Sequence, residues 1–238
     1  MPPKLSIVVP VYNEAECIGT VLETAAGVLA ARGLTSDCEL VVVNDGSRDE
    51  TGAMIDAMQQ LYSFVRPQHH AVNGGFGAAV WTGIAASRGE YVSLMPGDGE
   101  IGIEQILRFL DEIGDADLLV SRRVSNDAAT REAVRPWHRE LLSWGNARLM
   151  RTILGFDSRG MEGIFLARGE QLRALTCRSR SGLLCLEIIL RLHRQGAKTV
   201  RSTMEYRPRL AGQSKVTNLR SVAKTFWDMF KLRRSLAA

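Results

Sequence analysis

Long hydrophobic runs are absent from this 238-residue sequence. No stretch of about 18 uncharged apolar residues occurs, so we expect no membrane-spanning helix. The opening residues, MPPKLSIVVPVYNE, lack the basic region, long apolar region and cleavage site of a signal peptide. The four cysteines, Cys17, Cys38, Cys177 and Cys185, form no CxxC pair, which argues against a cysteine-based zinc site. These absences predict a protein of a reducing, cytoplasmic compartment.

Several catalytic motifs are missing as well. Neither HExxH nor GxSxG occurs, so hydrolase chemistry has little support, and the four histidines are interpreted as structural or surface residues. Gly74, Gly75 and Gly77 follow the third predicted strand, whereas a dinucleotide-binding GxGxxG would follow the first. This position disfavours a nicotinamide oxidoreductase. The small residues of GAAVWTGIAA predict a helix packed closely on a sheet.

Charge is unevenly distributed along the chain. Beyond position 190 there are twelve Lys or Arg and two acids, against 18 Lys or Arg and 24 acids before it. A basic tail on a mildly acidic body favours an anionic partner such as a phosphate or a lipid headgroup. The alternative is a solvated helical face. No recognition motif for nucleic acid accompanies the tail, so we expect no nucleic-acid partner.

Short apolar runs alternate with helical patterns through the first half of the chain. This alternation predicts an α/β fold with a mostly parallel sheet and helices on both faces. After Asn126 the pattern is less regular, but no linker or repeat interrupts it, so we expect a single domain. The predicted strands are Leu5–Val11, Glu39–Asn44, Phe64–His69, Tyr91–Met95, Asp117–Arg122, Gly163–Arg168 and Lys198–Tyr206. The later predicted helices are Trp137–Leu154, Leu183–Gln195 and Leu219–Arg234.

Polar clusters follow three of these strands: YNE, NDGSRDE and PGDGE. In open α/β sheets, ligands bind beyond the carboxyl ends of the strands. In PGDGE, Asp98 and Glu100 are spaced to aim two carboxylates the same way, as Mg²⁺ or Mn²⁺ would require. A solvated loop is the alternative there. Asp45 is suited either to a plain turn with Gly46 or to accepting hydrogen bonds from a nucleotide base.

The end of the chain carries two basic features. The segment RPRLAGQSK concentrates Arg207, Arg209, Ser214 and Lys215, donors that would clamp a phosphate unless the loop is merely solvated. The last predicted helix aligns an apolar stripe through Phe226, Trp227 and Phe230, bordered by Lys and Arg. Such an amphipathic helix docks on its own core or a partner subunit, or lies in a membrane interface.

Taken together, these segments resemble the family 2 glycosyltransferases, and within them the dolichyl-phosphate mannose synthase and polyprenyl-phosphate glycosyltransferase branch. The resemblance extends over nearly the whole chain, and the RxxGxSK pattern of residues 209–215 indicates the lipid-phosphate branch. It is carried by VVPVYNE, VVVNDGSRDETG, NGGFGAAVWTGIAASRGEYV, the acidic turn, VSR at Val120–Arg122 and YRPRLAGQSK.

The resemblance implies a GT-A fold and transfer from a nucleotide-diphosphate sugar with inversion. It implies a nucleotide-sugar-binding half over residues 1–125, an acceptor-side half over 126–217 and a basic helix over 218–238. Pro10, Tyr12, Glu14, Asp45, Gly77 and Asp98 would line the donor site. Asp98 and Glu100 would be catalytic through a bound Mg²⁺ or Mn²⁺, and Arg122, Arg209, Ser214 and Lys215 would hold the acceptor phosphate.

The acidic turn departs from the family pattern. Relatives carry DxD followed two residues later by Gln, whereas the corresponding positions here are Pro96, Asp98 and Glu100. One acid is lost and another gained, so the formal charge is conserved, and we interpret the site as rearranged. The segment DSRGMEGIF from Asp157 also departs from the serine-glycine-phenylalanine turn of relatives, on the acceptor side.

We therefore expect a metal-assisted glycosyltransferase that uses a GDP- or UDP-sugar and a polyprenyl-phosphate acceptor. A lipid phosphate is already anionic, so no general base is required. The expected location is cytoplasmic, with peripheral contact to the membrane or a membrane partner subunit through the last helix. The alternatives are transfer to a glycan or small-molecule hydroxyl, and a non-catalytic nucleotide-sugar-binding protein.

Overall fold

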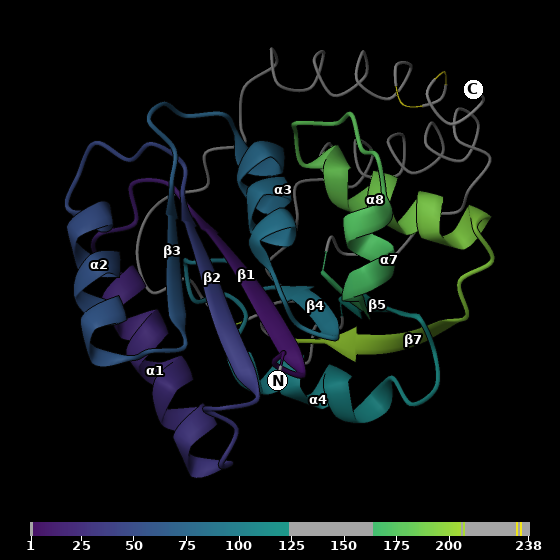
Figure 1. Ribbon diagram of the computed structural model, residues 1–238, viewed down its shortest axis with the longest axis horizontal. Helices are drawn as coiled ribbons and strands as arrows, with labels where there is room; N and C mark the ends of the chain where they lie inside the picture. The colour runs from purple at the N-terminus through teal and green to yellow at the C-terminus, as the bar shows by residue number, and fades with distance from the viewer. Residues whose placement is uncertain (1, 124–163, 206, 208–231, 233, 235–238) are drawn as a thin grey trace, which may run out of the picture.

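A computed structural model describes residues 2–123, 164–205, 207, 232 and 234. These residues form one seven-stranded sheet in the order β3-β2-β1-β4-β6-β5-β7 (Figure 1). Strand β6 is antiparallel to β4 and β5, and the other neighbours are parallel. The strands are β1 (Leu5–Val11), β2 (Cys38–Asn44), β3 (Val65–His69), β4 (Tyr91–Leu94), β5 (Leu118–Arg123), β6 (Phe165–Arg168) and β7 (Thr199–Met204).

The central strands are apolar because helices cover both faces of the sheet. Every residue of β2 is buried, and in β1 only Pro10 is partly exposed. Such uninterrupted burial is expected of parallel strands. The predicted strands are confirmed to within two residues at each end. The mostly parallel arrangement is confirmed too, although the reversed direction of β6 has no local signature in the sequence.

The helices form two groups. Helices α3, α7 and α8 contact one another and lie in front of the sheet in Figure 1, whereas α1 contacts α2 and α4. A Cβ atom on Gly83 of α3 would lie 2.2 Å from Cγ1 of Val8, so only glycine permits this approach to β1. The close packing predicted for this helix is confirmed. The helices are α1 (Ile18–Ala31), α2 (Thr51–Leu61), α3 (Phe76–Ala86), α4 (Ile103–Glu112), α7 (Gly169–Ala174) and α8 (Leu183–Arg194).

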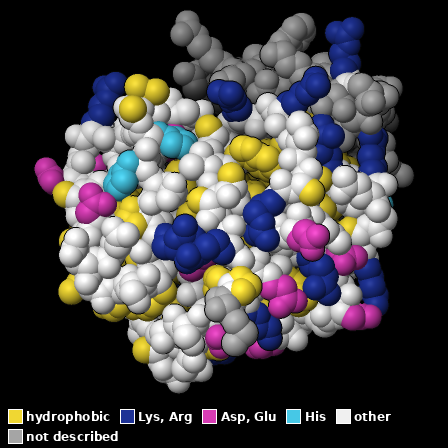
Figure 2. All heavy atoms as spheres, in the orientation of Figure 1, with side chains coloured by type: hydrophobic (Ala, Val, Ile, Leu, Met, Phe, Trp, Pro, Cys, Tyr) yellow, Lys and Arg dark blue, Asp and Glu magenta, His cyan; other side chains and the backbone are white. Residues whose placement is uncertain are grey.

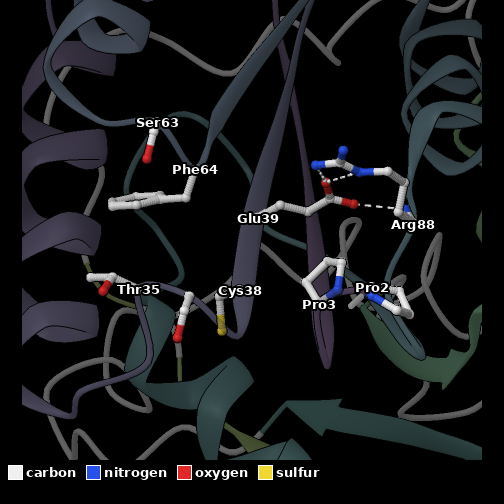
Figure 3. Close-up of a pocket in the computed structure, with 9 residues that line it drawn as sticks. Pro2, Pro3, Thr35, Cys38, Glu39, Ser63, Phe64 and Arg88 are labelled. Carbon is white, nitrogen blue, oxygen red and sulfur yellow. Dashed lines mark hydrogen bonds and ion pairs between the residues drawn. The ribbon is translucent and has the colours of Figure 1, made fainter.

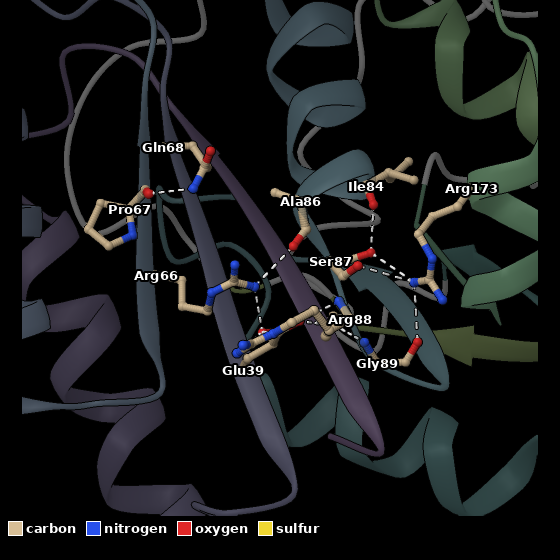
Figure 4. Close-up of polar contacts among 11 residues, drawn as sticks. Glu39, Arg66, Pro67, Gln68, Ile84, Ala86, Ser87, Arg88, Gly89 and Arg173 are labelled. Atoms are coloured by element: carbon tan, nitrogen blue, oxygen red, sulfur yellow. Dashed lines mark hydrogen bonds and ion pairs between the residues drawn. The ribbon is translucent and has the colours of Figure 1, made fainter. Parts of the chain in front are cut away.

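A buried carboxylate joins the amino ends of the central strands. Glu39 of β2 accepts hydrogen bonds from Ser6 Oγ at 2.6 Å, Arg66 Nη1 at 2.8 Å and the Arg88 backbone N–H at 2.6 Å (Figure 4). Burial raises the pKa of Glu39, but these bonds outweigh it and lower the pKa below its ordinary value. The network therefore links β1, β2, β3 and the segment after α3, away from the carboxyl ends of the strands.

An open cavity of about 640 Å³ lies beside this network. Figure 3 shows Glu39 and Arg88 on one side of it and the Phe64 ring on the other. The guanidinium groups of Arg66 and Arg88 already form ion pairs with Glu39, so we assign these charged residues a structural role.

Some predictions concern residues outside the described ranges. The helix predicted at Trp137–Leu154 lies there, as does the segment from Asp157. Most of the predicted helix Leu219–Arg234 does too, although Leu232 and Arg234 are helical, the first buried and the second exposed. Within the described parts of the chain, no helix is both long enough and apolar enough to cross a membrane.

Candidate functional site

The strand order reverses between β1 and β4, because β2 and β3 extend the sheet on one side of β1 and β4 on the other. At such a point the connections leave in opposite directions and open a crevice beyond the carboxyl ends. The three polar clusters predicted to line a site follow β1, β2 and β4 and therefore meet at this edge. Figure 2 shows basic side chains over the same upper part of the molecule, above α3 and α8 in the orientation of Figure 1.

The loop after β1 is fixed to the loop after β2. The Asn13 backbone N–H donates to Ser47 Oγ at 2.9 Å, and the Glu14 N–H donates to Thr51 Oγ1 at 2.9 Å. Asp49 accepts the Ala15 N–H at 3.2 Å and also the N–H of Thr51, the first residue of α2. Three residues predicted to line a nucleoside pocket are partly exposed here: Pro10 near the end of β1, and Tyr12 and Glu14 in the loop after it. These contacts fix the loop after β1 against the loop after β2.

Asp45 is almost fully buried, with 3% of its surface exposed. Its Oδ1 atom accepts the Gly74 N–H at 2.8 Å and lies 2.7 Å from His70 Nδ1, while Oδ2 accepts the Gly75 N–H at 2.8 Å. His70 Nε2 lies 2.9 Å from Thr82 Oγ1. The carboxylate therefore holds the glycine loop at the site's edge. Sequence analysis placed Asp45 there but missed His70 as its partner, since nothing local links them.

Gly77 packs against the loop that contains Arg180, which lies far along the chain. Its N–H donates to the Arg180 carbonyl at 3.1 Å, and a Cβ atom here would lie 2.4 Å from the carbonyl carbon of Arg180. The buried Glu187 of α8 holds this loop by accepting the N–H groups of Arg178 and Ser179. Because its N–H is bonded to this loop, Gly77 could affect a nucleotide pocket only by positioning the loop.

The acidic turn begins where β4 ends. A Cβ atom on Gly97 would lie 2.3 Å from Cγ1 of Val11, so glycine lets the turn lie against the end of β1. Gly99 has φ +76°, a conformation that other residues rarely adopt. Asp98 Oδ1 accepts the Glu100 N–H at 3.1 Å, and both acids are partly exposed. The two carboxylates thus lie on one short turn at the carboxyl edge of the sheet, and Gly97 and Gly99 shape that turn.

Cys17 connects this turn to the loop after β1. Its thiol lies 3.4 Å from the Gly97 carbonyl and 3.4 Å from Glu14 Oε2. Burial, followed by the hydrogen bond and charge of Glu14 and the charge of Asp98, raises the pKa of the thiol to about 12. Cys17 is therefore a protonated hydrogen-bond donor at neutral pH and not a nucleophile.

The donor atoms of the turn fit a hard divalent cation. Among the described residues, no three His, Cys, Asp or Glu side chains gather as a complete metal site. Two carboxylates at a crevice match the way Mg²⁺ is usually held, by one or two acids together with substrate phosphates. The residues present therefore fit an ion that binds together with a nucleoside diphosphate.

The acceptor-side residues are described only in part. Arg122 is exposed near the carboxyl end of β5, on the same edge as the acidic turn. Arg207 donates its backbone N–H to the Glu100 carbonyl at 2.9 Å, and its guanidinium lies 3.6 Å from Glu104 Oε2. Arg209, Ser214 and Lys215 lie outside the described residues. The sequence singled out Arg207 for its charge but gave no indication of its partner, Glu104.

Residues 6–169 match the family described as Glycosyl transferase family 2, and the chain belongs to this family. The match runs from Ser6 of β1 through β6 and includes the switch point and the loops after β1, β2 and β4, but not β7.

Among its relatives, the chain is 28% identical to the undecaprenyl-phosphate mannosyltransferase of Micrococcus luteus over 88% of this chain and 86% of that protein. It is 30% identical to the dolichyl-phosphate beta-glucosyltransferase ALG5A of Trichomonas vaginalis over 55% of this chain and 43% of that protein. It is 34% identical to the uncharacterised glycosyltransferase EpsJ of Bacillus subtilis over 47% of this chain and 31% of that protein. The chain thus spans less than half the length of the last two relatives.

Solved structures share the fold at low sequence identity. Mannosyl-3-phosphoglycerate synthase from Rubrobacter xylanophilus superposes with a TM-score of 0.68 at 16% identity, covering 97% of this chain and 72% of that one. Glucosyl-3-phosphoglycerate synthase from Mycobacterium tuberculosis, in complex with Mn²⁺, UDP and phosphoglyceric acid, gives a TM-score of 0.67 at 18% identity, covering 98% and 78%. The GT-A fold expected from the resemblance is thereby confirmed.

Proposed function

We propose that this chain transfers a sugar from a nucleotide-diphosphate sugar to a polyprenyl phosphate, with inversion at the anomeric carbon. One observation carries the proposal: Arg207, two residues before the RxxGxSK segment, donates its backbone N–H to the carbonyl of Glu100 in the acidic turn. This contact supports assigning the acidic turn and the segment that follows Arg207 in the sequence to one site. An undecaprenyl-phosphate mannosyltransferase matches over 88% of this chain, which supports the same acceptor class.

The donor would occupy the crevice between the loops after β1, β2 and β4. Pro10, Tyr12 and Glu14 would line the nucleoside pocket, with Asp45 and Gly77 fixing its edge. Asp98 and Glu100 would hold Mg²⁺ or Mn²⁺, the ions found with the nucleotide in structures of the same fold. When bound, such an ion neutralises charge on the departing nucleoside diphosphate.

The acceptor phosphate would be held by basic and hydroxyl groups on the other side of the crevice, from Arg122, Arg209, Ser214 and Lys215. These residues would bind and orient an oxygen that is anionic at neutral pH, so the reaction needs no side chain to remove a proton. A lipid acceptor would place the protein peripherally at the cytoplasmic face of a membrane.

The test is a donor and acceptor screen. Purified protein is incubated with undecaprenyl or dolichyl phosphate, Mg²⁺ or Mn²⁺, and radiolabelled UDP- and GDP-sugars, and the organic phase is analysed for lipid-linked sugar. The proposal predicts a product with one donor class, lost with chelator and in Asp98→Asn. Absence of any lipid-linked sugar from every donor contradicts it.

A second candidate acceptor is a small phosphorylated hydroxyl compound. A structure of the same fold contains phosphoglyceric acid, and a basic loop would suit such an acceptor as well. Including 3-phosphoglycerate in the screen separates the two. A water-soluble glycoside, together with unchanged turnover in Lys215→Ala, would favour this version.

A further inference from the structure

Two large apolar side chains are exposed where the loop after β3 enters α3. Among the described residues, the exposed large hydrophobic residues are Leu61 (66%), Val72 (76%) and Phe76 (45%). Leu61 is the last residue of α2, whereas Val72 lies in the loop before α3 and Phe76 is the first residue of that helix. Exposed apolar side chains that gather at one place mark a surface for a partner or a membrane.

Backbone contacts fix this loop in place. Gly46, in the loop after β2, has φ +68°, and a Cβ atom there would lie 2.6 Å from the carbonyl carbon of Val72. The carboxylate of Asp45 accepts the backbone N–H groups of Gly74 and Gly75. The loop is thus packed on its backbone side, while the Val72 side chain remains in solvent.

Two exposed arginines lie beside the loop, in the segment between α7 and α8. The Arg180 carbonyl accepts the N–H of Gly77, and Glu187 accepts the backbone N–H of Arg178. Among the described residues, no carboxylate pairs with either guanidinium group. Figure 2 shows hydrophobic and basic side chains near one another over the upper end of α3, in the orientation of Figure 1. Apolar surface and positive charge therefore meet at the carboxyl edge of the sheet.

We infer that this edge carries a docking surface for an anionic lipid bilayer, termed the α3 surface and made of Val72, Phe76, Arg178 and Arg180. Apolar side chains enter the boundary between headgroups and acyl chains, and basic side chains beside them attract anionic headgroups. Two apolar side chains are few for a stable protein interface, which buries about 800 Å² on each partner. The combination of few apolar groups with unpaired positive charge favours a lipid surface.

The α3 surface lies at the same edge of the sheet as the acidic turn. A polyprenyl phosphate has to be taken from a membrane, so a bilayer docked at this edge would bring the acceptor to the proposed site. This part in acceptor delivery rests on the proposed function, whereas the docking itself does not. The sequence predicted membrane contact only for residues 218–238, and the α3 surface contains none of them.

Vesicle sedimentation with the full chain tests the α3 surface. Wild type and two double variants are titrated with vesicles of phosphatidylcholine, with and without phosphatidylglycerol. One variant is Val72→Ser with Phe76→Ser, and the other is Arg178→Gln with Arg180→Gln. Each is expected to raise the concentration of anionic vesicles at half-binding about tenfold, because apolar burial or headgroup attraction is lost. With phosphatidylcholine alone, the arginine variant is expected to match wild type.

Exposed residues at the amino edge of the sheet supply matched controls. Leu61→Ser removes the third exposed apolar side chain, at the end of α2. Arg32→Gln with Arg194→Gln removes the same charge from the ends of α1 and α8. Both controls are expected to bind anionic vesicles as wild type does. If the two variants of the α3 surface also bind like wild type, the inference is wrong.

A fluorophore identifies which surface meets the bilayer, even where other residues contribute to binding. Val72→Cys and Leu61→Cys are each labelled with an environment-sensitive dye, since the native cysteines are buried or partly buried. The dye at position 72 is expected to shift its emission to shorter wavelength with anionic vesicles, and the dye at position 61 is expected not to respond. No response at position 72, or equal responses at both positions, overturns the inference.

Other occupants of the α3 surface give different results. Dimerisation without vesicles, seen by light scattering and lost in Val72→Ser with Phe76→Ser, would assign the surface to a second copy of the chain and overturn the inference. Loss of UDP or GDP binding in that variant, with vesicle binding unchanged, would assign the two side chains to the donor site and overturn it as well.

Vesicle binding needs neither donor nor turnover, so it separates this inference from the proposed function. If wild type forms no lipid-linked sugar but the dye at position 72 responds to anionic vesicles, the proposed acceptor is wrong and the docking surface stands. If lipid-linked sugar forms but the dye does not respond, the docking surface is wrong and the proposed function stands.

Discussion

His70 Nδ1 lies 2.7 Å from Asp45 Oδ1, at the carboxyl edge of the sheet. His70 comes just after β3 and Asp45 just after β2, so this contact joins the ends of two neighbouring strands. The same carboxylate accepts the N–H groups of Gly74 and Gly75. Asp45 thus organises the loop before α3 and has much of its hydrogen-bonding capacity used by the protein itself.

Replacement of Asp45 by Asn is expected to loosen this loop. An amide nitrogen in place of one carboxylate oxygen would leave one loop N–H group without an acceptor, at a cost of about 1–3 kcal/mol in the free energy of unfolding. We expect nucleotide affinity to fall at least tenfold. Urea unfolding and calorimetry with UDP and GDP measure both effects.

Asp56→Asn is the control for this substitution, because Asp56 lies 3.0 Å from His69 on the exposed side of α2. It is expected to change neither quantity appreciably. Equal effects of the two substitutions would contradict the role assigned to Asp45.

Gly97→Ala is expected to displace the acidic turn. Its Cβ atom would lie 2.3 Å from Val11 Cγ1, so the turn or the end of β1 must shift. Overpacking of this kind costs about 1–3 kcal/mol. We expect Mn²⁺-dependent nucleotide binding to weaken at least tenfold, measured by calorimetry.

Gly27→Ala supplies the comparison, since nothing lies within 4 Å of a Cβ atom there, inside α1. Alanine is favoured over glycine in a helix by about 0.5–1 kcal/mol, so this variant is expected to be more stable and to bind nucleotide normally. Normal nucleotide binding by Gly97→Ala would show that the turn does not depend on this contact.

Acid is expected to destabilise the protein through Glu39 and Glu187. Burial raises the pKa of each carboxyl, but hydrogen bonds lower it to below the ordinary value of 4.5. Glu39 accepts these bonds from Ser6, Arg66 and Arg88. Glu187 accepts them from residues 178–179 and Arg191. Because the folded pKa is lower, their stabilisation is complete above about pH 4.5 and is lost as the pH falls through the folded pKa.

The measurement is the free energy of unfolding in urea between pH 7 and pH 3. Glu39→Gln is expected to lower this free energy at pH 7 and to flatten its decline below pH 4.5. Glu23→Gln, on the exposed face of α1, is expected to follow wild type. A decline that remains as steep in Glu39→Gln would contradict this account.

The cysteines are expected to be inert in the folded protein. Burial is the largest cause that raises the pKa of Cys38 to about 11 and those of Cys17, Cys177 and Cys185 to about 12. At pH 8 we expect slow modification by iodoacetamide in native protein and rapid modification of all four in urea, followed by mass spectrometry. Fast native labelling of Cys17 would show that the contact with Gly97 is not maintained.

The sequence predicted the parts of the fold that are local. Leu5–Val11 and Cys38–Asn44 are continuous apolar runs, and their burial on both faces follows from that pattern. The direction of β6 and the order of the outer strands depend on pairing between distant segments, which no single run encodes. The same holds for the site. The acidic turn can be recognised in the sequence as PGDGE, but the contact between Gln105 and Glu205 joins residues 100 positions apart and has no local signal.

For the same reason, the sequence explains only in part why particular positions are glycine. Gly99, with φ +76°, fits the turn chemistry of its own segment, whereas the atoms nearest to Gly102 include the guanidinium of Arg207, far along the chain. Likewise, the small residues of GAAVWTGIAA predicted close packing, which Gly83 confirms, but not the contact of Gly77 with Arg180. The sequence therefore indicated candidate residues and left the contacts between distant segments undetermined.

The central claim is that Glu100 supplies the anionic ligand that Pro96 displaces. Electron paramagnetic resonance titration of Mn²⁺, with and without GDP or UDP, tests it in wild type, Asp98→Asn, Glu100→Gln and the control Glu112→Gln at the far end of α4. The account predicts nucleotide-dependent Mn²⁺ binding in wild type and Glu112→Gln, weakened at least tenfold in each of the other two. Binding by Glu100→Gln equal to that of wild type would contradict it.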